Sequence, residues 1–297
     1  MRIEGGTFGL LVTGSPGISC LTACSRPVWV IGRCRAVLER IVEVSLWDGP
    51  LSWSRGAIGL FMGANAGFQM LRNAGFVMQA TLPVAALPAW AVAPMTAAAV
   101  PIEDFSNLVL LGQAGTRLWD YIQDTETDSD HPFDEASQQL AQRFVDEYLG
   151  APNWQVVYPG PALLPLGRLA ELAGWGKASP LGLTINDEYG LWLAHRVAFL
   201  VDAPLPAIEP AAFPHPCDSC IGQPCIGACP VGAIDARSEF DIATCSEFRV
   251  RADSICAYRC LARLACPVGA GYRYGPAQMT HHYASGLASI RHYLESS

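Results

Sequence analysis

Eight cysteines lie close together near the C-terminal end of the chain. The first four follow a C-x2-C-x4-C-x3-C-P pattern, and the last of the second four is again followed by proline. In chain order these cysteines are Cys217, Cys220, Cys225, Cys229, Cys245, Cys256, Cys260 and Cys266. The hexapeptide Ala-Cys-Pro-Val-Gly-Ala at 228–233 returns unchanged at 265–270. This repeat indicates a duplicated metal-binding unit.

Iron–sulfur clusters are bound by cysteine thiolates that lie a few residues apart along the sequence. Bacterial ferredoxins supply three thiolates of a [4Fe-4S] cube from one tight run, and the cysteine before proline binds the other cluster. The same crossover predicts a first cluster on Cys217, Cys220, Cys225 and Cys266, and a second on Cys229, Cys245, Cys256 and Cys260. The spacing departs from the ferredoxin pattern, because x4 replaces x2 before Cys225 and the second half reads C-x10-C-x3-C-x5-C-P.

Three other uses of these cysteines stay open at this point. Structural zinc sites with four thiolates usually pair two short C-x2-C knuckles across a longer loop, whereas 217–229 holds four cysteines in one short run. Disulfides need an oxidising compartment, and the sequence shows no secretion signal. Unligated cysteines are the third alternative. Two [4Fe-4S] clusters are the prediction that the spacing favours.

The cysteine segment is similar to the ferredoxin-type tail of epoxyqueuosine reductases and reductive dehalogenases, through its Cys-Pro pattern and the interval from Cys229 to Cys245. Gly176-Lys177, the run 181–186 and Glu188-Tyr189-Gly190 also resemble the "GK, then LLINPEYG" hairpin that precedes the cysteines in that family. The resemblance spans about residues 170–267.

This resemblance implies an α/β domain that holds a corrinoid (cobalamin) beside two [4Fe-4S] clusters, which feed electrons to cobalt. The chain departs by a much shorter N-terminal domain, and no position matches the catalytic acid of epoxyqueuosine reductase, so no catalytic residue is assigned. Two functions follow as expectations. One is a ferredoxin-like electron-transfer protein, and the other is a reductase, an oxidoreductase whose clusters feed a corrinoid or another organic cofactor.

The helices and strands that are expected to position the cysteines precede them in the sequence. The sequence predicts, in order, a strand at 107–112, a helix through Leu118 and Ile122, a helix from Pro132 to Gly150, a strand at 154–158, a helix at 166–172, and a hairpin of 180–185 with 191–201. Strands mixed with helices predict an α+β fold, with an α/β-like domain and a mixed sheet over 62–210. A small bacterial-ferredoxin-type domain with a C-terminal helix follows over 211–297, and His281-His282 is expected on the surface of that helix.

Residues 1–61 differ from the rest of the chain. The segment is richer in arginine than in acids, lacks sustained periodicity, and holds Cys20, Cys24 and Cys34 in no ligand pattern. It is interpreted either as a mis-called extension, with the natural start at Met62 or Met70, or as a real irregular segment.

Charge and hydropathy exclude two classes of partner. A net charge of -8 offers no broad basic face for nucleic acid. No charged residue lies between Arg72 and Glu103, but four prolines interrupt this run, so a membrane span is not expected. We therefore expect a cytoplasmic protein whose partner is a redox protein or a small-molecule acceptor.

Overall fold

The computed structural model describes residues 55–125, 129–206, 214–235 and 240–296, all within one compact unit, Trp53–Ser297. Cys20, Cys24 and Cys34 lie outside the described residues. The main elements of the sheet-containing part are α2 (Arg55–Ala74), β1 (Met78–Pro83), α3 (Ala89–Ala97), β2 (Asn107–Ala114), α4 (Arg117–Asp124), α5 (Pro132–Arg143), η3 (Phe144–Tyr148), β3 (Trp154–Tyr158), α6 (Leu166–Leu172), β4 (Lys177–Ala178), β5 (Thr184–Ile185) and β6 (Leu193–Val201).

The main sheet has four strands in the order β1-β2-β6-β3, and every neighbouring pair is antiparallel. The predicted mixed sheet is therefore wrong. The strand, turn and helix of β2 and α4 do occur as expected, but β6 inserts between β2 and β3, so these two strands never pair. The fold is nevertheless mixed helix and strand, as an α+β protein requires.

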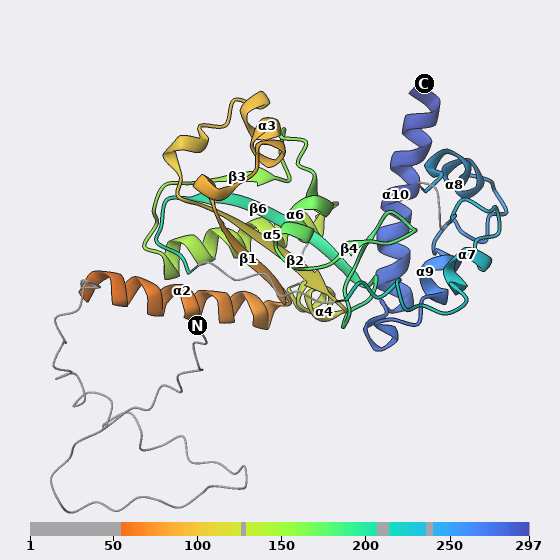
Figure 1. Ribbon diagram of the computed structural model, residues 1–297, viewed down its shortest axis with the longest axis horizontal. Helices are drawn as coiled ribbons and strands as arrows, with labels where there is room; N and C mark the ends of the chain where they lie inside the picture. The colour runs from red at the N-terminus through yellow and green to blue at the C-terminus, as the bar shows by residue number, and fades with distance from the viewer. Residues whose placement is uncertain (1–54, 126–128, 207–213, 236–239, 297) are drawn as a thin grey trace, which may run out of the picture. The chain divides into compact units, whose positions relative to one another are not determined.

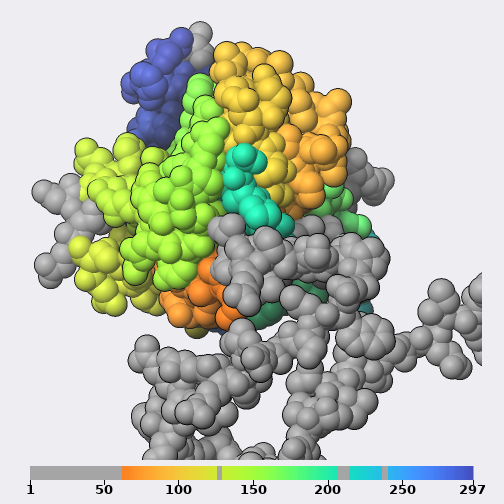
Figure 2. Space-filling view, turned by 90° about the vertical axis from the view of Figure 1, so that its left-hand side faces the viewer, coloured from red at the N-terminus to blue at the C-terminus, as the bar shows by residue number. Residues whose placement is uncertain are grey.

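Helices cover both faces of the sheet (Figure 1). One apolar cluster joins α2, α4 and α5 to one face, and a second joins α3 and α6 to the other. All of β2 is buried in consequence, which explains why its sequence is a continuous apolar run rather than an alternating one. In Figure 2 the segment that holds α2 to α6, coloured orange to green, forms most of the visible surface.

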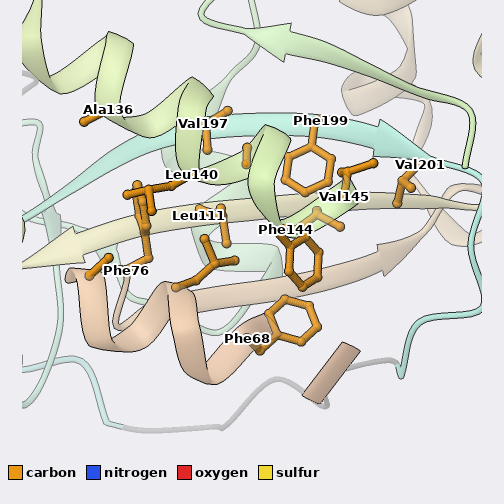
Figure 3. Close-up of a cluster of buried hydrophobic side chains, with 14 of the residues drawn as sticks. Phe68, Phe76, Leu111, Ala136, Leu140, Phe144, Val145, Val197, Phe199 and Val201 are labelled. Atoms are coloured by element: carbon orange, nitrogen blue, oxygen red, sulfur yellow. The ribbon is translucent and has the colours of Figure 1, made fainter. Parts of the chain in front are cut away.

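Aromatic rings fill the cluster on the α2 face (Figure 3). The ring centroids of Phe68 and Phe144 lie 4.8 Å apart, and Phe144 meets Phe199 of β6 at 6.3 Å. A Cβ on Gly67 would lie 2.5 Å from the Phe144 ring, so the missing side chain lets α2 approach η3 closely. Because α2 begins at Arg55, the proposed boundary at residue 61 falls inside this helix.

The charge-free run between Arg72 and Glu103 folds into β1 and α3, separated by a short 3-10 turn. Pro83 ends the strand and Pro88 is the N-cap of α3. In the part of the chain that the structure describes, no helix is both long and apolar enough to cross a membrane. β1 itself was not predicted from the sequence.

The predicted hairpin is also wrong. β5 pairs with β4 in a separate two-stranded sheet, while β6 lies in the main sheet. A bridge between Asn186 and Gly190 closes the loop between them, as the sequence implied, but the two flanking strands belong to different sheets.

The C-terminal part contains α7 (Pro224–Gly227), α8 (Ile242–Arg249), α9 (Leu261–Ala265), a 3-10 turn η4 (Ala270–Tyr272) and α10 (Pro276–Ser296). A third apolar cluster joins Leu181, Ile185 and Leu191 to Ile234, Ala262 and Cys266 of this part. On α10, the buried Gln278 amide donates to the carbonyl of Gly115 at 3.4 Å. The long helix therefore ties the cysteine segment to the sheet.

Candidate functional site

The first cysteines lie on a turn that is attached to the small sheet. His215 makes both attachments: its Nδ1 accepts from the backbone N–H of Cys217 at 3.0 Å, and its Nε2 bonds the Ala178 carbonyl of β4 at 2.9 Å. An imidazole that accepts at Nδ1 and donates at Nε2 is the neutral form. Cys225 follows on α7. Thus His215 holds the start of the cysteine segment at a fixed place.

The later cysteines are held by short helices. Asp241 is the N-cap of α8 and accepts from the Thr244 N–H at 2.9 Å, which fixes the helix that carries Cys245. Cys260 is itself the N-cap of α9, and its sulfur accepts from the Arg263 N–H at 3.4 Å. An N–H that points at a thiolate sulfur is also a feature that adjusts the potential of iron–sulfur centres.

The eight thiols fall into two sets by the way that their charges interact. Burial raises the pKa of Cys217 to about 11, and repulsion from Cys266, Cys225 and Cys220 adds to it. Burial likewise raises the pKa of Cys245 to about 11, with repulsion from Cys260, Cys229 and Cys256. The sets are Cys217, Cys220, Cys225 and Cys266 (the first set), and Cys229, Cys245, Cys256 and Cys260 (the second set).

All four thiols of the second set line one cavity of about 240 Å³. Apolar side chains complete much of its wall, among them Ile234 and Phe240, and Tyr283 of α10 also lies there. A [4Fe-4S] cube takes four cysteine thiolates. The type and number of donors therefore fit a cube. Ligation by either set stays a prediction.

The cysteine side chains of the described residues can be compared with the disulfide and zinc alternatives. All eight are free thiols, with no disulfide among them. Nor does any group of three or more His, Cys, Asp or Glu side chains in the described ranges converge as the ligands of one metal ion.

A second cavity, of about 330 Å³, lies between the sheet and the C-terminal part. Its polar lining consists of Thr184, Tyr158, His195, Arg196, Arg263, Tyr274 and His282. The arginines of this cavity were not among the predicted site residues. The sequence does carry a signal for them, because His195 and Arg196 are adjacent basic side chains inside an otherwise apolar strand.

The expected surface position of His281-His282 is wrong. Both rings are half-buried and contact Phe133, with centroid distances of 5.5 and 4.5 Å. They are packed in because α10 returns against α4 and α5 instead of standing free. Trp175 and Trp192 are buried.

No family model and no curated protein matches this chain. Among solved structures, epoxyqueuosine reductase with a modified tRNA-Tyr stem loop matches at a TM-score of 0.50 and 15% identity, over 75% of this chain and 69% of that one. The chain resembles epoxyqueuosine reductase in fold. The epoxyqueuosine reductase from Streptococcus thermophilus matches at 0.47 and 13%, over 71% and 67% of the two chains. A reductive dehalogenase described for B12-dependent dehalogenation matches at 0.40 and 12%, over 63% of this chain and 29% of that one.

Proposed function

We propose that this chain is an iron–sulfur redox protein that binds two [4Fe-4S] clusters, one on each set of four thiols, and transfers electrons through them. The observation that carries the proposal is that eight free thiols lie in one segment and that all four thiols of the second set line a single cavity. The similarity in fold to epoxyqueuosine reductase, a redox enzyme by name, supports the same class of function.

The chain's own residues would hold and insulate these clusters. The thiols ionise on binding iron, and the cubes supply one-electron chemistry. Apolar side chains around the second set keep water away, while the Arg263 N–H at Cys260 stabilises negative charge on that sulfur. In the first set, Cys266 is buried and lies in the third apolar cluster.

Anaerobic purification with iron and acid-labile sulfide analysis tests the proposal. About eight iron and eight sulfide per chain are expected from two cubes. Cys220→Ser is expected to lose about half of each, whereas Cys34→Ser, outside both sets, should lose none. Zinc without labile sulfide, or a full iron content in Cys220→Ser, would contradict the proposal.

The second candidate function is a reductase that passes these electrons to an organic acceptor. The 330 Å³ cavity favours it, because Arg263 lines that cavity while its backbone N–H bonds Cys260 of the second set. The volume is at the lower end for small-molecule sites. A corrinoid has several times more atoms than this cavity holds, so the residues present fit a small acceptor and no step through a corrinoid is derived. Cobalt at one atom per chain after growth with cobalamin would overturn this choice.

A further inference from the structure

The 330 Å³ cavity has a cationic and aromatic lining. Two arginines, two histidines and two tyrosines contribute, and none of its lining residues is acidic: Tyr158, His195, Arg196, Arg263, Tyr274 and His282. Guanidinium groups stay charged in proteins. A buried positive charge without a carboxylate partner costs free energy unless something compensates it. The lining of this cavity therefore lacks a negative charge that would balance its arginines.

Arg196 is the first group that lacks a carboxylate partner at ion-pair distance. Its guanidinium carbon lies 4.2 Å from the centre of the Phe133 ring, and one terminal nitrogen is 3.4 Å from His282 Nε2. Its Nε is buried with no hydrogen-bond acceptor. Within the described ranges no carboxylate forms an ion pair with it, although Arg196 also lines a neighbouring cavity with Asp130 and Asp134, and the charge of Asp134 acts on it.

Arg263 likewise has no carboxylate at ion-pair distance within the described ranges. Its side chain lies between the rings of Trp192 and Tyr274, at 4.5 and 4.9 Å from their centres. One terminal nitrogen donates to the Leu191 carbonyl at 2.6 Å, which fixes the guanidinium in place. Its Nε is also buried and unpartnered.

His195 adds a third unmet group. Its ring lies parallel to Trp175, with centroids 6.0 Å apart, and its Nε2 is buried without a partner. Burial, and then the charge of Arg196, lower the pKa of His195 to about 4, so the ring is neutral near pH 7 and its Nε2 can donate if the proton lies there. Three of the described residues that hold an unpartnered buried side-chain atom thus line one cavity.

We propose that this cavity binds a small molecule through an oxyanion, either a carboxylate or a phosphate group. An oxyanion accepts several hydrogen bonds at once, matches the fork of a guanidinium, and neutralises charge that the protein leaves unpaired. Two guanidinium groups with no acidic residue in the cavity lining therefore favour such a ligand over water alone. A volume of 330 Å³ admits roughly ten non-hydrogen atoms. Binding does not depend on iron, but a role as electron acceptor rests on the second candidate function above.

Calorimetric titration of the anaerobically purified full chain tests the inference. The probes are inorganic phosphate and acetate, with chloride at equal ionic strength and neutral acetamide as controls. Phosphate or acetate should bind and the controls should not. Binding of phosphate alone assigns a phosphate ester, and binding of acetate assigns a carboxylate. Failure of both oxyanions to bind would overturn the inference.

Matched variants locate the binding. Arg196→Gln should weaken it at least tenfold, and Arg196→Lys, which keeps the charge but not the fork, should weaken it less. Arg143→Gln removes the same charge from an exposed ion pair with Glu147, so it should bind as the wild type. If Arg196→Gln does not fold, as judged by circular dichroism, Arg196→Lys decides, and wild-type affinity in the variant that folds overturns the inference.

Iron and sulfide contents of the same samples separate the two proposals. A chain with both clusters that binds no oxyanion contradicts this inference alone. A chain that binds oxyanion but contains no labile sulfide contradicts the proposed iron–sulfur function alone.

Discussion

The backbones of Gly190 and Gly269 lie so close that neither residue has room for a side chain. A Cβ on Gly190 would lie 2.0 Å from the Val268 carbonyl oxygen, and one on Gly269 would lie 2.2 Å from the backbone of Tyr189. Both residues also have positive φ, 58° and 67°. This contact joins the loop before β6 to the second Ala-Cys-Pro-Val-Gly-Ala repeat, and so fixes Cys266 relative to the sheet.

The first prediction compares equivalent glycines in the two copies of the hexapeptide Ala-Cys-Pro-Val-Gly-Ala. Gly232 is the counterpart of Gly269, with φ 66°, but a Cβ there would meet nothing within 4 Å. Gly232→Ala should cost only the left-handed strain, about 1–2 kcal/mol. Gly269→Ala should cost a further ~1–3 kcal/mol from the clash and should reduce iron bound by the first set. Urea unfolding and iron analysis measure both, and equal losses in the two variants would contradict the role of the contact.

Local signals in the sequence located most elements of the fold. The apolar run of β2, the proline at the first turn of α5 and the periodicity of α6 each specify an element without reference to the rest of the chain. Strand pairing depends on distant segments instead. β1 and β6 both pair with β2, and nothing near β6 in the sequence indicates that it lies between β2 and β3.

The candidate functional residues divide in the same way, into those indicated by local sequence signals and those brought together from distant segments. Cysteine spacing and the repeated Cys-Pro indicated a metal-binding segment because ligands of one cluster lie close along the chain. The 330 Å³ cavity could not be found in this way, since Arg196 on β6 and Arg263 on α9 are far apart in the sequence and line one cavity only in the folded chain. Two adjacent basic side chains within an apolar strand, His195 and Arg196, were the available signal.

The second prediction concerns pH. The pKa of His195 is about 4 in the folded chain because of burial and of Arg196, against 6.5 ordinarily. Between these values the unfolded chain binds more protons, so the stability contributed by the neutral ring is fully present above pH 6.5 and is lost as pH falls toward 4. His195→Gln should remove up to about 3 kcal/mol of this decline in the free energy of unfolding.

Urea unfolding between pH 4 and 7 measures this effect. The control is His292→Gln, which replaces an exposed histidine on α10 and should leave the decline unchanged. A wild-type pH dependence in His195→Gln would show that the neutral ring contributes nothing.

The third prediction concerns the N-terminal segment. A chain that starts at Met62 keeps Ala64, Phe68 and Leu71, the buried residues through which α2 contacts the sheet cluster. It should therefore fold and carry the same iron as the full chain. A chain that starts at Gly75 loses that face of α2 and should be destabilised by several kcal/mol. Thermal unfolding and iron analysis compare the two, and a Met62 chain without iron would show that residues 1–61 contribute to the fold.

The last prediction tests crossover ligation with pairs of substitutions. If Cys266 binds the cluster of the first set, Cys220→Ala with Cys266→Ala removes two ligands of one cube, so about four irons should remain. Cys266→Ala with Cys245→Ala removes one ligand from each cube and should leave almost none. The reverse result, a half-full Cys266/Cys245 variant, would mean that Cys266 shares a cluster with Cys245. Because each double variant lacks the same number of thiols, iron and sulfide per chain decide between these arrangements without reference to stability.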